Sequence, residues 1–387
     1  MQFQKRSVNP RAAELNRVVE RAVNGWVRAR DRFAGKIGLG GRAADYDDEA
    51  YEFVGGARDS LRKKHYDKSL RLLWKAEQAL PWTSFRDAND AEKKLTDAAI
   101  GNLSPAEKAA RARITSQEFR DLLDREYTLA EKKALVGVLS AIGHGEAYAW
   151  LVSASMLAEV KSTGARAAVT MQVVEEAKHF VVLRELIQAF NVEIPRLSVW
   201  EYMLLEGCLK AKGLNRFFGM NVLVETIALS IFGLLSDKPG LEVLRLFHLD
   251  ESRHTALPDN YFKEFPLSAW QSKSPTSRLT RLRMALPAVP LVLLLEPELA
   301  ELGTDVFEFA GSVLRKAVHL AERGGFYLPL PGKPMLAGFN AIFNAYCFAT
   351  RENHTFRDYM AADTTHGEAE AAVEREIFGH APPVAAE

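Results

Sequence analysis

Glu175-Glu-Ala-Lys-His179 and Asp250-Glu-Ser-Arg-His254 follow one pattern: an acidic residue, then Glu-x-x-His with a basic residue before the histidine. On a helix with 3.6 residues per turn, positions three apart differ by about 60° in direction, so the Glu and His of one motif can reach the same metal ion. A single Glu-x-x-His arises often by chance. Here there are two, and each follows a segment with a carboxylate among apolar residues, Glu146 and Glu225. Together they indicate a metal site built from helices.

Apolar residues around these motifs recur at helical spacing, with almost no alternation of period two, so the sequence predicts an all-α protein. Thr128-Leu-Ala-Glu131 is a capping box and places the start of a helix at Leu129. Turns are expected at 161–164 and 236–240, and Pro258 should end the last helix. The four expected helices cover about 129–160, 165–190, 215–236 and 241–256. Two helix pairs with short turns, joined by a long connection, are the layout of a four-helix bundle with one crossover.

The spacing of the carboxylates agrees with these turns. Glu146 and Glu176 are 30 residues apart, and their midpoint, position 161, falls at the start of the first turn. Glu225 and Glu251 are 26 residues apart, with a midpoint at position 238, inside the second turn. Residues equidistant from the turn of an antiparallel hairpin lie at the same height. The two members of each pair should therefore face each other.

Four carboxylates and two imidazoles offer oxygen and nitrogen ligands with four negative charges, which two divalent cations would offset. Iron or manganese fits this ligand set better than zinc or copper. The order Glu, Glu-x-x-His, Glu, Glu-x-x-His on four helices resembles the ferritin-like di-iron carboxylate proteins. These include bacterial multicomponent monooxygenases, acyl-carrier-protein desaturases, arylamine N-oxygenases and the ribonucleotide reductase small subunit. The resemblance covers residues 128–258.

The resemblance implies a catalytic centre of two iron ions with one or more bridging carboxylates, and leaves manganese in place of one iron open. The ligands would be Glu146, Glu176, His179, Glu225, Glu251 and His254. Glu175 and Asp250, which precede ligand glutamates, would each hydrogen-bond a ligand imidazole, with Lys178 and Arg253 balancing their charge. The alternative is a set of buried ion pairs. That interpretation is disfavoured because few Lys or Arg residues lie near Glu146 or Glu225 in the sequence.

Several positions depart from particular members of that superfamily. Leu183 stands where the ribonucleotide reductase subunit has its radical tyrosine, so that activity is not expected. Ala228 and Leu229 stand where monooxygenases and desaturases commonly place a Thr. Phe247 stands where arylamine N-oxygenases have a third His ligand, and His248 follows one residue late. The helical period turns His248 about 60° from the ligand face, so we expect it beside the ligands rather than among them.

The chain has 387 residues, of which 48% are hydrophobic and 26% charged, and its 50 basic and 50 acidic side chains cancel. This balance is ordinary for a globular protein and supplies no basic field for nucleic acid. Cys208 and Cys347 cannot build a disulfide framework and, with a polar N-terminus, favour a cytoplasmic location. No membrane span is expected. Met284–Leu295 is too short, and Phe217–Leu235 carries Glu225 near its centre.

The chain shows no internal repeat or low-complexity linker, so we expect one helical domain over residues 1–387. Its expected parts are N-terminal helices that dock on the core (1–127), the metal-binding four-helix core (128–258) and C-terminal helices (259–387). Breaks are expected at Gly35–Asp48 and Pro81–Asp90, and Pro331–Pro334 should divide the C-terminal third into two helices.

About 250 of the 387 residues lie outside the four core helices, more than a bare metal-binding bundle needs. We expect them to cover a pocket, and therefore expect a non-haem di-iron oxygenase that uses O₂ to hydroxylate, N-oxygenate or desaturate a small or medium organic molecule. No flavin, nicotinamide or iron–sulfur motif is evident, so electrons would come from a separate donor. The alternative is a ferroxidase or a non-catalytic metal-binding bundle. The sequence leaves a homodimer open.

Overall fold

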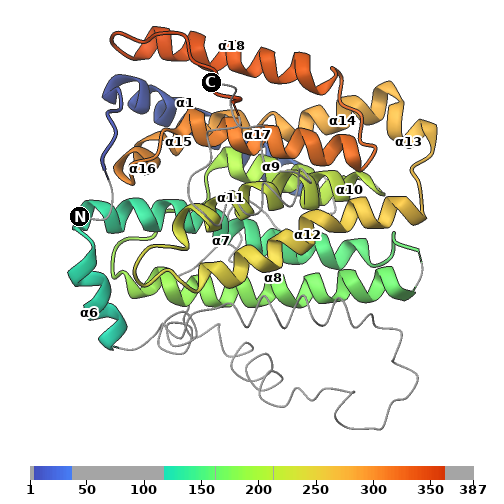
Figure 1. Ribbon diagram of the computed structural model, residues 1–387, viewed down its shortest axis with the longest axis horizontal. Coiled ribbons are helices and arrows are strands. Elements are labelled where there is room, and N and C mark those ends of the chain that lie inside the picture. The colour runs from blue at the N-terminus through green and yellow to red at the C-terminus, as the bar shows by residue number, and fades with distance from the viewer. Residues whose placement is uncertain (1–3, 37–116, 162, 212, 362–387) are drawn as a thin grey trace, which may run out of the picture.

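The computed structural model describes residues 4–36, 117–161, 163–211 and 213–361. Every regular element within these ranges is a helix, so the all-α prediction is confirmed for the described part of the chain (Figure 1). The expected break at Pro81–Asp90 and most of the predicted N-terminal segment 1–127 lie outside the described residues.

Within the described ranges, most consecutive helices are joined by short connections. The helices before the second motif are α1 (Pro10–Lys36), α6 (Gln117–Glu126), α7 (Leu129–Met156), α8 (Thr163–Ala189), α9 (Val199–Lys210), α10 (Asn215–Phe217), the π-helix η5 (Phe218–Val224) and α11 (Glu225–Leu235). From the second motif onward they are α12 (Leu244–Glu264), α13 (Ala269–Lys273), α14 (Pro275–Ala285), α15 (Ala288–Leu294), α16 (Glu296–Glu301), α17 (Val306–Arg323) and α18 (Gly332–Thr350).

Two helix pairs carry the motifs. α7 begins at the predicted capping box, where the backbone N–H of Thr128 donates to Glu131 at 2.8 Å and that of Glu131 donates to the Thr128 hydroxyl at 3.2 Å. α7 packs along α8, and α11 packs along α12. In addition, α12 lies against α8 and η5 lies against α7, so the two pairs share one packed interior (Figure 1).

The chain that leads into α11 is wider than an α-helix. Phe218–Val224 is π-helical, and the backbone N–H of Glu225 donates to the carbonyl of Met220, five residues earlier. The sequence predicted one regular helix from Asn215, because an apolar run carries no residue type that marks a π turn. Such turns are rare and frequent at functional sites. Here the wide turn ends at Glu225.

The prediction that Pro258 ends the fourth helix is wrong, because α12 continues through it to Glu264. Proline has no N–H, so the carbonyl of His254, four residues earlier, loses its usual helical donor. The side-chain amide of Asn221, in η5, donates to that carbonyl at 2.9 Å. This bond satisfies the buried acceptor and allows the helix to continue.

The remaining helices cover the upper side of the core in Figure 1. α1 packs on α9 and α15, and α17 packs on α11, α12 and η5. Within the described residues the C-terminal third forms α13–α18 rather than the two helices predicted. Pro331 does precede α18, but Ser268, Ser274 and Asp305 cap further helices that were not predicted from the sequence.

Two helical stretches, α7 and the continuous run from Asn215 to Leu235, are long and apolar enough to cross a membrane by length and composition. Their most apolar windows are 72% and 89% buried inside the protein. Core helices of a folded protein pass the same test, so these stretches are weak evidence for a span.

Candidate metal centre

The six residues that the two motifs single out come together in the interior. They are Glu146 in α7, Glu176 and His179 in α8, Glu225 at the first position of α11, and Glu251 and His254 in α12. None of these residues is more than 3% exposed. The midpoints of the two hairpins predicted that the carboxylates of each pair face each other, and in the structure the carboxylates of both pairs meet in one cluster.

Their ligand atoms form two overlapping groups that could each hold a metal ion. The first group is Glu146, Glu176, His179 and Glu251, and the second is Glu176, Glu225, Glu251 and His254. Within each group, one atom of every residue lies within 4.8 Å of the others. Each group therefore offers three carboxylates and one imidazole. Glu176 and Glu251 belong to both, as bridging carboxylates would.

Both imidazoles turn the same ring nitrogen toward the carboxylates. Nδ1 of His179 lies 2.9 Å from Oε1 of Glu251 and 3.5 Å from Oε2 of Glu146. Nδ1 of His254 lies 2.9 Å from Oε2 of Glu251 and 3.2 Å from Oε1 of Glu176. Nδ1 is therefore the atom that each histidine would present to an ion.

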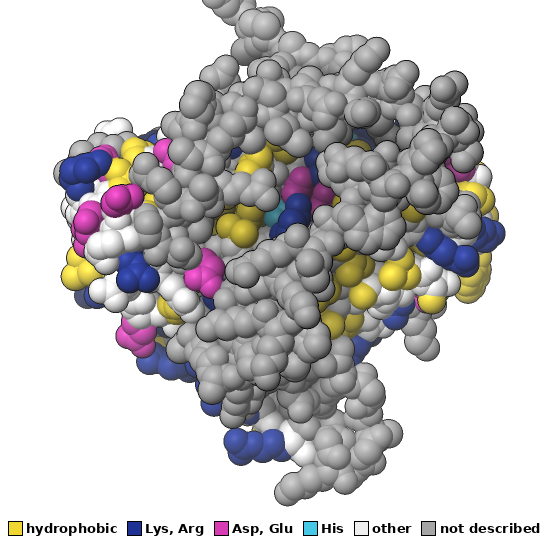
Figure 2. All heavy atoms as spheres, turned by 90° about the horizontal axis from the view of Figure 1, so that it is seen from below, with side chains coloured by type: hydrophobic (Ala, Val, Ile, Leu, Met, Phe, Trp, Pro, Cys, Tyr) yellow, Lys and Arg dark blue, Asp and Glu magenta, His cyan; other side chains and the backbone are white. Residues whose placement is uncertain are grey.

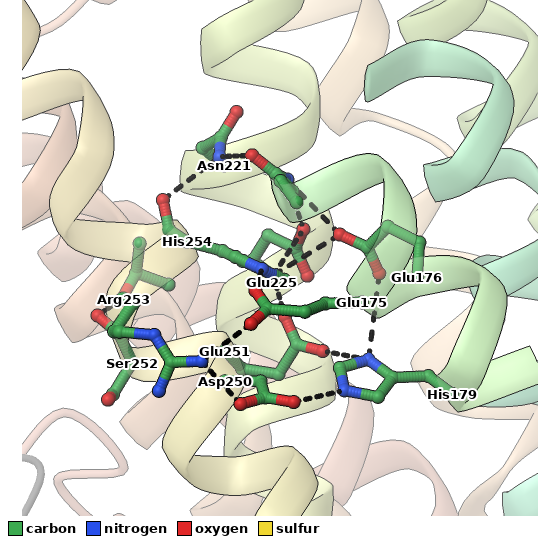
Figure 3. Close-up of polar contacts among 12 residues, drawn as sticks. Glu175, Glu176, His179, Asn221, Glu225, Asp250, Glu251, Ser252, Arg253 and His254 are labelled. Atoms are coloured by element: carbon green, nitrogen blue, oxygen red, sulfur yellow. Dashed lines mark hydrogen bonds and ion pairs between the residues drawn. The ribbon is translucent and has the colours of Figure 1, made fainter. Parts of the chain in front are cut away.

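The outward ring nitrogens bind acids of the opposite motif. Nε2 of His179 donates to Asp250 at 3.0 Å, and Nε2 of His254 donates to Glu175 at 2.9 Å (Figure 3). Asp250 comes from α12 and Glu175 from α8, so each motif orients the histidine of the other. Hydrogen bonds of this kind fix both the tautomer and the ring orientation of a histidine ligand.

Arg253 joins the two outer acids. Its Nη2 donates to Glu175 at 2.8 Å and to Asp250 at 2.5 Å, and Nζ of Lys178 lies 3.5 Å from Asp250. Burial alone would raise the pKa of Asp250, but the hydrogen bond from His179 and the two cations hold it below its usual range. Asp250 is therefore an ionised acceptor. Figure 2 shows charged side chains of both signs beside a histidine on one face of the molecule.

The inner carboxylates are removed from water and lie close to one another. Burial raises the pKa of Glu176 to about 8 and that of Glu225 to about 7, and repulsion from neighbouring carboxylates adds to both shifts. Burial likewise raises the pKa of Glu146 and that of Glu251. A bound divalent cation reverses this balance, because it favours the ionised carboxylates.

Several buried polar atoms of the cluster make no hydrogen bond to any described residue. They are both carboxylate oxygens of Glu146, Oε2 of Glu176, Oε1 of Glu251 and Nδ1 of His179. Buried polar atoms are rarely left in this state, because an unpaired one costs about 1–3 kcal/mol. Five such atoms are concentrated in this one cluster, although others occur elsewhere in the described part of the chain. The donor set therefore fits metal ions.

Gln172 and Asn221 extend the site, and neither was predicted from the sequence. The Gln172 amide donates to Glu225 at 2.9 Å and to Glu176 at 3.2 Å, and its oxygen accepts from Asn221 at 3.0 Å. Each lies four residues before a glutamate of the cluster, which places it on the same helical face. That spacing is the signal that could have found them.

Two further buried histidines, His144 and His248, belong to neither metal-binding group. Nδ1 of His248 donates to the backbone carbonyl of Leu229 at 2.9 Å, and His248 is absent from both metal-binding groups. His248 therefore lies outside the set of candidate ligands, as the helical period indicated. Nδ1 of His144 lies 3.5 Å from Oε1 of Glu201, and His144 is likewise absent from both groups.

A small cavity of about 40 Å³ lies against the cluster. It is lined by Glu146, Glu225, Gly145 and apolar side chains, with Glu201 at its wall. A side chain at Gly145 would meet nothing within 4 Å, so this glycine leaves open space beside Glu146 rather than a tight helix contact. Phe247 does not line this cavity and stacks on the imidazole of His179 with ring centroids 4.3 Å apart.

The all-helical architecture and the buried cluster of acids and histidines are compatible with a ferritin-like fold. Comparison of the chain with protein-family models, with curated proteins and with solved structures found no match.

Proposed function

We propose that this protein is a ferritin-like, non-haem di-iron oxygenase that oxidises an organic substrate with O₂. The observation that carries the proposal is the pair of overlapping groups, each with three carboxylates and one histidine, which share Glu176 and Glu251. Carboxylate oxygen with imidazole nitrogen suits iron or manganese. Two ions would offset the four carboxylates, as a single ion would not.

Each residue then has a defined task. Glu146 and His179 would hold one ion, Glu225 and His254 would hold the other, and the shared Glu176 and Glu251 would bridge them. Iron at both positions is our first assignment, with manganese at one position as the variant. Asp250 and Glu175 keep Nδ1 of each histidine directed at the ions, through their bonds to Nε2.

When bound and reduced, a di-iron pair supplies the redox chemistry that activates O₂. Insertion of one oxygen atom into a substrate sends the other to water and uses two electrons and two protons, which a separate electron donor and solvent would supply. The chain excludes bulk water, because the six ligand residues are almost fully buried. The Gln172 amide holds Glu176 and Glu225 in place by donating to both carboxylates.

The surroundings of the cluster favour an oxygenase over a ferroxidase. The cavity against Glu146 and Glu225 is lined mainly by aliphatic side chains, which suits an organic substrate and O₂. A ferroxidase needs a hydrophilic, acidic path for iron. Among the described residues, the metal-binding groups are the two of this cluster, so no further group that could take up iron on its way to them is seen there.

The test is iron loading followed by oxygen consumption. The protein should hold close to two iron ions, or one iron and one manganese, per chain by elemental analysis. With excess ferrous iron and O₂ but no organic substrate, it should stop after one oxidation per site. The Glu176→Ala and Glu251→Ala variants, as controls, should retain their helicity and lose most of the metal.

Two results would overturn this proposal. Zinc alone, or no more than one tightly bound ion, would contradict a di-iron centre. Rapid multi-turnover accumulation of ferric mineral would replace the oxygenase with the ferroxidase.

A further inference from the structure

A second cavity, of about 110 Å³, lies between η5 and α11 on one side and α14, α15, α17 and α18 on the other. Every side chain that lines it is aliphatic, aromatic or methionine, among them Leu223, Val289 and Phe339. A polar group of an occupant would find no side-chain partner there, and burying an unpaired polar group costs about 1–3 kcal/mol. The cavity therefore suits a purely hydrocarbon occupant. We call it the apolar cavity.

The apolar cavity adjoins the metal centre. Four side chains line both it and the small cavity against Glu146 and Glu225, and so form the wall between the two spaces: Ile227, Ile231, Leu291 and Leu295. This wall consists of aliphatic side chains, which exchange rotamers without losing a hydrogen bond. Hydrocarbon in the apolar cavity therefore lies one layer of aliphatic side chains from the cluster.

The other end of the apolar cavity adjoins a surface pocket of about 440 Å³. Val318 and Leu328 line both spaces. The surface pocket also contains polar side chains, with Arg278 on one side and Glu322 on the other. Surface pocket, apolar cavity and metal centre therefore form a series, polar at its outer end and apolar along its length.

Arg278, the cation of the surface pocket, forms no ion pair with a described carboxylate. Nε of Arg278 is buried without a hydrogen bond. That guanidinium lies 5.8 Å from the Tyr327 ring, and Nζ of Lys273 lies 4.9 Å from the same ring. Glu322, the acid of the pocket, accepts the backbone N–H of Gly332 at 3.1 Å. The surface pocket thus favours an anionic group beside Arg278.

A second cation, the Arg281 guanidinium, lies near Arg278 and adds to the positive charge there. Arg281 is fully buried and bonds neutral acceptors, with Asn215 at 3.1 Å and the carbonyls of Ser272 and Tyr327 each at 2.8 Å. Burial lowers the pKa of Arg281 to about 10, and repulsion from Arg278 contributes. Two neighbouring guanidinium groups without a described carboxylate partner are typical of a site for a carboxylate or phosphate.

We propose that the substrate is a single unbranched hydrocarbon chain with an anionic head group, bound head outward. The head group pairs with Arg278, the chain fills the apolar cavity, and its methyl end passes the aliphatic wall to reach Glu146 and Glu225. This inference rests on the proposed oxygenase function, since it names that enzyme's substrate class. It also makes oxidation of carbon the expected chemistry, because an arylamine nitrogen would be unpaired in the apolar cavity.

The cavity volumes limit the length of the hydrocarbon chain that the protein can bind. A water-sized group needs about 10–15 Å³ by this measure, so the apolar cavity accepts roughly eight such groups and the small cavity roughly three. A chain of about ten to twelve carbons therefore fits. We take dodecanoate as the probe.

The first experiment measures binding without metal, so that it does not depend on the proposed function. Calorimetric titration of the full-length, metal-free protein with dodecanoate, below its micelle concentration, should show one site per chain. Arg278→Gln should weaken dodecanoate binding about tenfold and leave dodecanol binding nearly unchanged. Arg283→Gln is the matched control, because Arg283 lies on the same helix, is exposed and lines none of the three spaces.

A larger side chain in the wall of the apolar cavity should reduce the length of hydrocarbon chain that the protein binds. Ala310→Phe, at the wall of the apolar cavity, should abolish dodecanoate binding and retain that of hexanoate. Ala288→Leu, a smaller change on the opposite wall, provides the same comparison where Ala310→Phe fails to fold. Absence of dodecanoate binding to the wild type, or equal binding by the Arg278→Gln variant, would overturn the inference while leaving the metal centre untouched.

The second experiment tests the orientation. In protein loaded with Mn²⁺, nuclear relaxation of ¹³C-labelled dodecanoate should be enhanced more at the methyl carbon than at the carboxyl carbon. Protein loaded with Zn²⁺ provides the diamagnetic baseline. Stronger enhancement at the carboxyl carbon would overturn the head-outward placement. Failure of the protein to bind Mn²⁺ would instead count against the proposed function, and the calorimetric result would still stand.

Discussion

Each candidate histidine ligand depends on an acid that is distant in the sequence. Asp250 lies 71 residues from His179, and Glu175 lies 79 residues from His254. The sequence could indicate that these acids bond an imidazole, because each precedes a motif glutamate. It could not show which imidazole each acid binds, because that depends on the rotation of α8 against α12. No local pattern determines that rotation.

At Asp250, replacement by Asn should weaken metal affinity roughly 10–100-fold, because the side chain that orients Nδ1 of His179 loses its charge. Metal competition with a chromophoric chelator measures the change. His248→Ala should have a smaller effect, since His248 bonds a backbone carbonyl rather than a cluster residue. The reverse ranking would place His248 among the ligands.

The overlap of the two groups predicts different metal counts for different glutamates. Glu146→Ala and Glu225→Ala each remove a residue of one group, so each variant should keep about one ion per chain. Glu176→Ala removes a residue common to both groups and should lower the affinity of both. Elemental analysis after gel filtration gives the counts, with far-ultraviolet circular dichroism as the folding control. Equal losses in all three variants would argue against shared ligands.

Among the elements, the wide turn η5 and the proline in α12 compensate for each other. The proline removes the N–H that would serve the His254 carbonyl, and Asn221 supplies a replacement across the helix pair. The same Asn221 side chain donates to Gln172, which in turn donates to Glu176 and Glu225. A local irregularity in each helix is thus linked to the positions of two candidate ligands.

Asn221→Ala should lower the free energy of unfolding by about 1–3 kcal/mol, because it leaves two buried acceptors unpaired. In a Pro258→Ala background the loss should be smaller, since the alanine restores a backbone N–H donor for the His254 carbonyl. Denaturant unfolding of the single and double variants gives the coupling energy between the two positions. Additive effects of the two changes would mean that Asn221 does not compensate for the proline.

The helices of the core were predictable where the sequence marks their ends. The capping box at Thr128 predicted the start of α7 correctly. The spacing of the glutamate pairs predicted that their carboxylates face each other, and they meet in one cluster. The course of α12 was not predictable in this way, because the residue that permits Pro258 lies on another helix. Helices α13, α15 and α16 were missed because their 5, 7 and 6 residues span too few turns to show a period, and α14 was missed although it has 11 residues.

For the molecule as a whole, the buried cluster lowers the stability of the folded state when no cation is bound and should raise it when cations are bound. Burial raises the pKa of all four carboxylates, repulsion among them adds to the shifts, and several of their oxygens lack hydrogen-bond partners among the described residues. Ions bound to the folded state alone shift the folding equilibrium by mass action. Stability should therefore depend strongly on metal.

Removal of metal should lower the melting temperature markedly. At free metal about 1,000 times the dissociation constant, one site contributes about 4 kcal/mol of stability. Differential scanning calorimetry with Fe²⁺ under argon, or with Mn²⁺ in air, measures the shift. The Glu251→Ala variant should show little change on addition of metal. An equal rise in this variant would indicate that metal stabilises the protein elsewhere.

The crossed bonds between the two motifs also set an order of events during synthesis. When α7 and α8 have left the ribosome, His179 has no Asp250 to hold its ring, because that residue follows 71 positions later. We therefore expect the first half of the chain alone to hold metal ions more weakly than the folded chain, because its histidine is not yet oriented by an acid. Docking of the two hairpins would complete both candidate groups at once.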